Sequence, residues 1–224
     1  MFELYLDSVD VDQISRYNDC LPLRGVTCNP SILAASGQGL QQLLPALTAV
    51  LGGAARFHVQ VVSRTAPEML EEARRLHALP YDIVVKVPAD EAGLAAMKMM
   101  KAEGLCVLAT AIYSAQQGFL AALCGADYLA PYVNRIDAMG ADGIGVVADL
   151  QLLLDRHGLE STLLPASFKN TRQAMAVLKL GVGAITLPLD VAAQMLGHPA
   201  AAAAVEQFTR DWQQTFPGRL SHEA

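Results

Sequence analysis

The chain has 224 residues, of which 53% are hydrophobic, and it carries a formal net charge of −6. This length supplies a sizeable core and fits either one α/β barrel or two small domains. No long linker rich in glycine, serine or proline divides the chain, so we predict a single barrel. The basic residues are scattered, which argues against a nucleic-acid or anionic-membrane surface. An anionic ligand would therefore need a local pocket.

Targeting and metal-binding signals are missing from the sequence. The apolar stretches fall short of the ~18 residues that span a bilayer, and the N-terminal segment lacks the basic start of a signal peptide. We therefore expect a cytoplasmic protein. The four cysteines show no CxxC spacing and the five histidines no HxH or HExxH pattern. Structural thiols are the interpretation we adopt, and we expect no metal and no cofactor.

Eight short apolar runs predict β-strands, and segments of helical periodicity lie between them. The strands are predicted over residues 2–6, 25–28, 57–61, 83–87, 106–110, 128–133, 162–167 and 184–187. The helices are predicted over residues 40–51, 67–78, 91–103, 114–124, 143–156, 171–180 and 191–196. This alternation is typical of the α/β class and favours a closed (β/α)8 TIM barrel. Pro131 and Pro165 fall inside predicted strands, and each requires a bulge or an early strand end.

A further helix is predicted over residues 199–216, with Val205, Phe208, Trp212 and Phe216 on one face. Because eight strand–helix units are already complete, this apolar face must contact a surface outside the barrel wall. The bottom of its own barrel and a neighbouring subunit are the two alternatives. We divide the chain into a barrel domain, 1–198, and a C-terminal helix and tail, 199–224, which we expect to pack on a neighbouring subunit.

Lys86 stands inside the apolar strand 83–87. Alternation puts Val84 and Lys86 on one face of that strand, so the amine enters packed surroundings. Burying an unpaired ammonium is costly, which favours a lowered pKa, and a neutral amine attacks carbonyls to form Schiff bases. The alternative is that Lys86 reaches water or pairs with a carboxylate.

Polar side chains at the ends of seven predicted strands favour the chemical interpretation of Lys86, because barrel enzymes take catalytic groups from several strand ends. These residues are Asp7, Thr27, Asn29, Gln60, Lys86, Thr110, Tyr132, Asn134, Arg135, Ser167 and Lys169. The eighth strand ends in Leu187 and Pro188, which offer no side-chain chemistry. Each residue also has a structural explanation, such as helix capping by Asp7 or Asn29, or an Arg135–Asp137 pair. We expect His58 to be a core histidine, one layer below Gln60.

Five segments of the chain resemble the transaldolase family, and within it the small fructose-6-phosphate aldolases. The segments are Leu4–Asp7, Gly25–Ser31, Ile83–Pro88, Ala130–Asp137 and Ala166–Lys169. The similarity covers nearly the whole chain. It implies a Schiff base at Lys86 and no cofactor. Transaldolases typically have glutamate and phenylalanine where this chain has Gln60 and Tyr132, the aldolase pair.

The resemblance implies a class I aldolase that cleaves or forms the C–C bond of a ketose phosphate such as fructose 6-phosphate, giving dihydroxyacetone and glyceraldehyde 3-phosphate. A transaldolase that transfers the dihydroxyacetone unit is one alternative, and a non-catalytic phosphate-binding barrel is another. Asn170-Thr171 is closer to the transaldolase pattern. The resembling aldolases form decamers of two pentamers with exchanged tail helices, so we expect a homo-oligomer.

The expected roles divide the site residues into three groups. Gln60, Thr110 and Tyr132 hold a water for proton transfer beside Lys86. Asp7 and Asn29 bind hydroxyls of the donor fragment, the Asp7 carboxylate also orients the reacting groups, and Thr27 contributes to substrate binding. Arg135 and Ser167 bind the phosphate, because a guanidinium fork and a hydroxyl match its oxygens, and Lys169 or Arg172 assists them.

Overall fold

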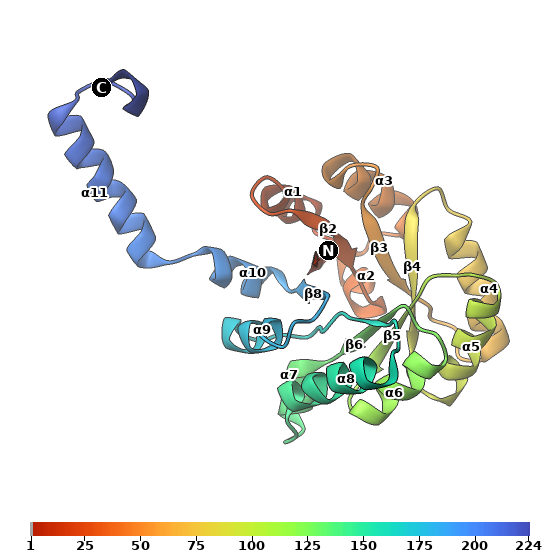
Figure 1. Ribbon diagram of the computed structural model, residues 1–224. Helices are drawn as coiled ribbons and strands as arrows, with labels where there is room; N and C mark the ends of the chain where they lie inside the picture. Colours follow the sequence, from red (N-terminus) through yellow and green to blue (C-terminus); the bar gives the residue numbers. More distant parts are fainter. Residues whose placement is uncertain (1) are drawn as a thin grey trace.

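Eight parallel strands pair side by side in the computed structural model, which describes residues 2–224 (Figure 1). The strands are β1 (Glu3–Asp7), β2 (Leu23–Thr27), β3 (Arg56–Gln60), β4 (Asp82–Pro88), β5 (Val107–Ile112), β6 (Tyr128–Pro131), β7 (Thr162–Leu163) and β8 (Ala184–Leu187). Their order is β7-β6-β5-β4-β3-β2-β1-β8. The amide of Thr186 donates to the carbonyl of Pro165 at 3.2 Å and draws the two ends of the sheet together. The predicted (β/α)8 barrel is thereby confirmed.

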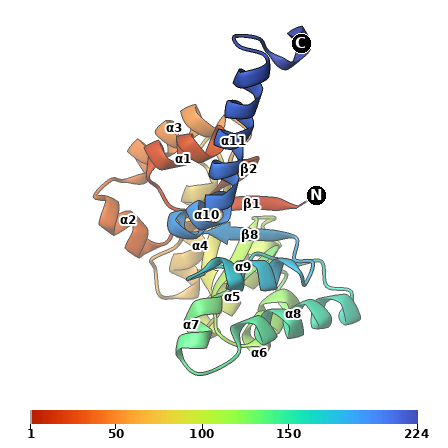
Figure 2. The same ribbon diagram turned by 90° about the vertical axis from the view of Figure 1, so that its left-hand side faces the viewer.

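Helices alternate with the strands and cover the outside of the barrel, except the last one, which projects from it (Figures 1 and 2). They are α1 (Val11–Asn18), α2 (Pro30–Ser36), α3 (Leu40–Leu51), α4 (Ala66–His77), α5 (Glu91–Ala102), α6 (Ala115–Leu123), α7 (Val133–Ala138), α8 (Gly143–His157), α9 (Thr171–Leu178), α10 (Leu189–Leu196) and α11 (Pro199–Thr215), and a 3-10 turn, η1, spans Ser221–Glu223. Outward strand side chains such as Val85 and Val87 pack under the helices. Tyr5, Val84 and Leu108 belong to a separate core inside the barrel.

The two prolines end their strands early. Strand β6 stops at Pro131 and β7 stops at Leu163, before Pro165. A proline offers no N–H to a neighbouring strand, which interrupts the regular ladder. The carbonyls of Pro131 and Pro165 still accept, from the amides of Ala166 and Thr186, and Tyr132 forms an isolated bridge with Ala166. The strands predicted to run to residues 133 and 167 are therefore too long, and α7 starts at Val133 instead.

Three short helices were not predicted: α7, which starts where a strand was expected to continue, and α1 and α2, which carry side-chain caps. Their caps are side chains that accept backbone hydrogen bonds: Asp10 from Gln13, and Asn29 from Ser31 and Ile32. Asp10, not Asp7, thus caps the first helix. Helix α1 has only eight residues, and α2 has seven and buries none of them.

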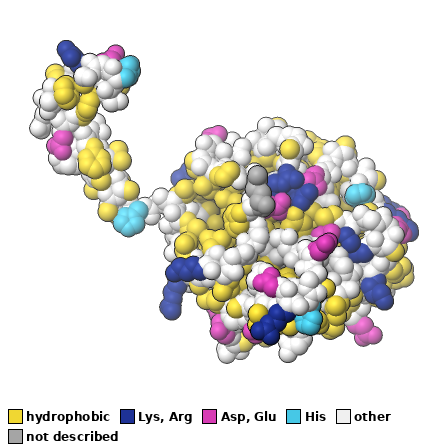
Figure 3. Space-filling model, in the orientation of Figure 1, with side chains coloured by type: hydrophobic (Ala, Val, Ile, Leu, Met, Phe, Trp, Pro, Cys, Tyr) yellow, Lys and Arg dark blue, Asp and Glu magenta, His cyan; other side chains and the backbone are white. Residues whose placement is uncertain are grey.

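Helix α11 extends away from the barrel, as Figures 1 and 2 show. Its hydrophobic side chains are visible on the projecting arm in Figure 3, and Val205 and Phe208 are 62% and 68% exposed. Trp212 packs against Phe216 within the arm, with ring centroids 4.7 Å apart. The apolar face of α11 therefore does not cover the bottom of its own barrel. None of the helices among the described residues is long and apolar enough to cross a membrane.

Candidate active site

Lys86 lies inside the barrel near the carboxyl end of β4, and only 4% of its surface is exposed. In the strand register it is paired with Gln60 on β3 and with Leu108 on β5. Its Nζ donates a hydrogen bond of 2.7 Å to the carbonyl oxygen of Cys28. The amine thus neither reaches water nor pairs with a carboxylate. The nitrogen is buried and is held by a backbone carbonyl of the residue that follows β2.

Tyr132 and Thr110 form a buried hydroxyl pair on the next two strand ends. Their oxygens are 2.9 Å apart. The β5–β6 register shifts between Ala109 and Ile112, and Ala111 has a positive φ of 54°. Such a conformation costs an alanine about 1 kcal/mol or more. The irregular backbone directly after Thr110 is the kind of local strain that clusters at functional sites.

A second polar cluster joins β1, β2 and β8. The hydroxyl of Thr27 donates to the carboxylate of Asp7 at 2.7 Å and lies 2.8 Å from the hydroxyl of Thr186. Both threonines are 1% exposed. Thr186 shows that the eighth strand does offer side-chain chemistry, contrary to the expectation from its last residues. Its signal in the sequence is the alternation of Ala184-Ile185-Thr186-Leu187, which puts a hydroxyl on the inner face.

Gln60 has a side-chain oxygen, Oε1, that is buried and has no hydrogen-bond partner. A buried acceptor of this kind costs about 1–3 kcal/mol unless a ligand or water completes it. The loop that follows Gln60 is held by Glu72, whose carboxylate accepts from the amides of Val62 and Ser63 and from the Ser63 hydroxyl. These hydrogen bonds fix the backbone next to Gln60, whose Oε1 can accept a hydrogen bond from a ligand.

Asn29 caps a helix with its side-chain oxygen and keeps its side-chain nitrogen available for a ligand. Its Oδ1 accepts from the amides of Ser31 and Ile32, at 3.0 Å in each case, so the oxygen is occupied as the cap of α2. Only the Nδ2 hydrogens remain, so Asn29 can act at the mouth as a donor.

Arg135 lies against Tyr132, with its guanidinium carbon 4.8 Å from the ring centroid. Its Nη1 is 3.5 Å from the hydroxyl of Tyr113, and this contact raises the pKa of Arg135 further. Asp137 accepts hydrogen bonds from Gly143 and Gln173, and is not the partner of Arg135. An exposed cation is therefore presented beside Tyr132.

Ser167 and Lys169 follow β7 in the loop before α9. Ser167 has a positive φ of 61°, and its carbonyl accepts from the amide of Asn134 at 2.7 Å. Lys169 is exposed. Asn170 caps α9 by accepting from the amide of Gln173 at 3.0 Å, so its departure from the aldolase sequence has a structural role.

His58 is a core histidine, as predicted, and is fully buried. Its ring packs edge to face against Tyr5 and Tyr128, at 4.7 and 5.2 Å between centroids. Burial, with the nearby charges of Lys86 and Arg56, holds the pKa of His58 well below its ordinary value. Neither ring nitrogen has a hydrogen-bond partner. The layer below Lys86 is therefore aromatic and uncharged.

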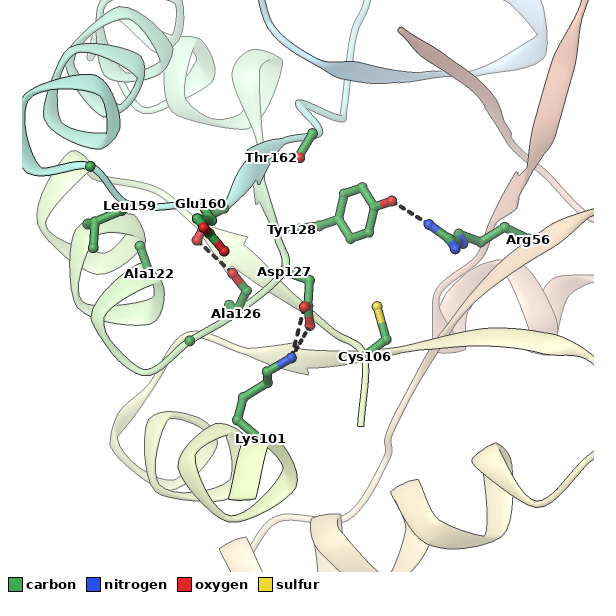
Figure 4. Close-up of a pocket in the computed structure, with 13 residues that line it drawn as sticks. Arg56, Lys101, Cys106, Ala122, Ala126, Asp127, Tyr128, Leu159, Glu160 and Thr162 are labelled. Atoms are coloured by element: carbon green, nitrogen blue, oxygen red, sulfur yellow. Dashed lines mark hydrogen bonds and ion pairs between the residues drawn. The ribbon is translucent and has the colours of Figure 1, made fainter. Parts of the chain in front are cut away.

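Two cavities lie at opposite ends of the barrel. One, of about 650 Å³, opens beside Asp7 and extends along α1 and α2. The other, of about 630 Å³, lies at the amino ends of the strands (Figure 4). Lys101 pairs there with Asp127 at 2.7 Å, and Arg56 donates a hydrogen bond to the Tyr128 hydroxyl at 2.6 Å. We place the chemistry at the carboxyl end, since the amino end of such barrels serves stability.

The model of the transaldolase/fructose-6-phosphate aldolase family matches residues 4–221. The chain belongs to this family. This family comprises transaldolases and fructose-6-phosphate aldolases, which act on sugar phosphates.

Solved structures with low sequence identity share the fold. A flavocytochrome b2 mutant with pyruvate bound has a TM-score of 0.60 at 10% identity, over 84% of this chain and 56% of that one. A putative isomerase from Sinorhizobium meliloti gives 0.61 at 12%, over 85% and 52%. A putative fructose-1,6-biphosphate aldolase from Coccidioides immitis gives 0.56 at 12%, over 84% and 73%. The chain thus spans just over half the length of the first two.

Proposed function

We propose that this member of the family is a class I aldolase that cleaves or forms the C–C bond of a ketose phosphate such as fructose 6-phosphate. The products of cleavage are dihydroxyacetone and glyceraldehyde 3-phosphate. The observation that supports this best is the buried Lys86 amine, paired in register with Gln60 and flanked by aliphatic strand residues.

The reaction begins when the uncharged Lys86 amine attacks the ketone carbonyl. The carbinolamine loses water and gives an iminium, which withdraws electrons from the adjacent carbon. The next C–C bond breaks as the distal hydroxyl loses its proton, and the aldehyde phosphate leaves. The enamine is then protonated on carbon, and hydrolysis of the iminium releases dihydroxyacetone and restores Lys86.

Proton transfer is assigned to the Tyr132–Thr110 pair together with Gln60. The two hydroxyl oxygens are 2.9 Å apart, and Gln60 contributes an unpartnered Oε1. In the proposal these groups hold one water between them, and Tyr132 donates and accepts the proton that moves. General acid–base catalysis of this kind requires donors and acceptors that can bind the water, and that are not held more strongly by other groups of the protein.

The other residues bind the ends of the substrate. Asp7, Thr27 and Asn29 bind hydroxyls of the three-carbon donor, and Thr27 orients the Asp7 carboxylate through its 2.7 Å hydrogen bond. Arg135, Ser167 and Lys169 bind the phosphate.

A transaldolase is the second candidate, since Asn170-Thr171 resembles the transaldolase pattern whereas Gln60 and Tyr132 resemble the aldolase pair. Incubation with fructose 6-phosphate alone separates the two. Release of free dihydroxyacetone marks the aldolase, whereas a transaldolase needs an aldose phosphate to accept the fragment.

Borohydride trapping tests the Schiff base directly. The enzyme is incubated with fructose 6-phosphate and borohydride, and the peptide that contains Lys86 is analysed by mass spectrometry. We expect a reduced adduct on Lys86, and none in Lys86→Arg, whose guanidinium stays protonated. An unmodified Lys86 peptide in the wild type would leave the non-catalytic phosphate-binding barrel as the better explanation.

We also propose that the C-terminal helix and tail, 199–224, pack on a neighbouring subunit of a homo-oligomer. The exposed Val205 and Phe208 support this, because an apolar face of this size is unfavourable in water. Phe208→Asp should lower the subunit number seen by analytical ultracentrifugation, whereas Gln214→Asp on the opposite face should not. Equal sedimentation of both variants with the wild type contradicts the proposal.

A further inference from the structure

Gln173 is a buried polar residue that the proposed chemistry does not use. It lies in the first turn of α9, and its surface is 8% exposed. Burying a polar side chain to this extent destabilises the folded protein unless the side chain forms hydrogen bonds. The partners of Gln173 therefore indicate what it does.

The side chain of Gln173 joins two loops that come from different strands. Its Oε1 accepts from the amide of Lys169 at 2.8 Å, in the loop after β7. Its Nε2 donates to the carboxylate of Asp137 at 2.6 Å and to Oδ1 of Asn134 at 3.3 Å, both on α7 after β6. One side chain thus ties the segment of Lys169 to the helix that carries Arg135.

A backbone hydrogen bond reinforces this link at the strained residue of the loop. The amide of Asn134 donates to the carbonyl of Ser167 at 2.7 Å, and Ser167 has a φ of 61°. A serine in this left-handed conformation needs surrounding contacts to hold it there. Asn134, which Gln173 also contacts, is the residue that supplies one.

We propose that Gln173 and Asp137 form a clamp that sets the spacing between Arg135 and the Ser167–Lys169 segment, and so determines how well the enzyme binds a phosphate. Gln173 and Asp137 are positioning residues, and the phosphate itself contacts Arg135, Ser167 and Lys169. The inference rests on the proposed function for its statement that the substrate is a phosphate ester. Schiff-base formation at Lys86 is independent of it.

Exchanging the donor and the acceptor provides the test. Gln173→Glu places a carboxylate against Asp137 and removes the donor, while the double variant Gln173→Glu/Asp137→Asn restores one donor, one acceptor and the wild-type net charge. In the double variant the new asparagine still has an oxygen for the amide of Gly143, which Asp137 accepts at 2.8 Å. Gln173→Met removes all three hydrogen bonds of the side chain without adding charge.

A matched control is available on the surface of α8. Gln151 donates to Asp155 at 2.9 Å in an exposed pair, so Gln151→Glu makes the same chemical change far from the mouth. Binding of inorganic phosphate is measured by calorimetry at constant ionic strength, together with KM and kcat for fructose 6-phosphate. Arg135→Gln locates the bound phosphate, since it should abolish the signal.

We expect phosphate to bind Gln173→Glu and Gln173→Met about 10-fold more weakly or worse, with a matching rise in KM, as for the loss of a charge-assisted contact. The double variant should return close to the wild-type affinity, and Gln151→Glu should keep it. Equal affinities throughout, wild-type affinity in Gln173→Met, failure of the double variant to recover, or no binding of phosphate to the wild type overturns the clamp. Borohydride trapping of Lys86 with dihydroxyacetone is scored separately, so a failure there removes the proposed aldolase and leaves the clamp tested.

Discussion

Acidification should destabilise the barrel through His58. The ring is fully buried between two tyrosines, and burial above all keeps its pKa well below the ordinary value of 6.5. In the unfolded chain the same imidazole takes up a proton near pH 6.5. Because the folded pKa lies below the unfolded one, this stability contribution is fully present above about pH 6.5 and is lost as the pH falls toward the folded pKa.

The size of the loss follows from the two protonation states. Below the unfolded pKa the free energy of unfolding falls by about 1.4 kcal/mol per pH unit, so lowering the pH from about 7.5 to about 5.0 should cost about 2 kcal/mol from His58 alone. Denaturant titrations at the two pH values measure the total change. Other carboxylates and histidines contribute to that total, so a variant is needed to isolate His58.

His58→Phe isolates the contribution, because it keeps an aromatic ring between Tyr5 and Tyr128 and removes the titration. On acidification the free energy of unfolding of the wild type should fall by about 2 kcal/mol more than that of His58→Phe. Parallel pH dependences for the two proteins would show that His58 is protonated in the folded state, and the dry aromatic layer below Lys86 would then be wrong.

Two further predictions concern the proton-transfer pair and the barrel wall. Tyr132→Phe should lower kcat for aldol cleavage by about 10²-fold while borohydride still traps Lys86, and unchanged cleavage excludes Tyr132 as the proton donor. Gly25→Ala should destabilise the protein by about 3 kcal/mol, because its new Cβ would lie 1.8 Å from the carbonyl oxygen of Arg56, whereas Gly53→Ala meets nothing within 4 Å. Equal melting temperatures of the two glycine variants contradict this.

The regular part of the fold was predictable because its elements are long or strongly apolar. The helix predicted over residues 40–51 and the strand predicted over 184–187 coincide with α3 and β8. The short helices α1, α2 and α7 were not predicted, although α9 and α10, of eight residues each, were. Pro131 and Pro165 predicted correctly that two strands would be irregular or short, since β6 ends at Pro131 and β7 ends at Leu163.

The site was predictable to the extent that it depends on alternation along single strands. Lys86, Gln60 and Thr27 point inward because parallel strands align their inner faces. What the sequence did not reveal depends on neighbouring loops: the positive φ values of Ala111 and Ser167, and the contacts of Gln173. No local pattern encodes these features, since each exists only when two strand ends meet.

The places where local rules fail are concentrated at one end of the barrel. Ala111 follows Thr110, and Ser167 is itself a candidate phosphate ligand; both are non-glycine residues with left-handed backbones. A regular strand would continue along the direction of the sheet. A bulge or an early strand end instead turns the chain across the mouth of the barrel. We interpret the strain at Ala111 and Ser167 as the cost of turning separate strand ends across the same mouth of the barrel.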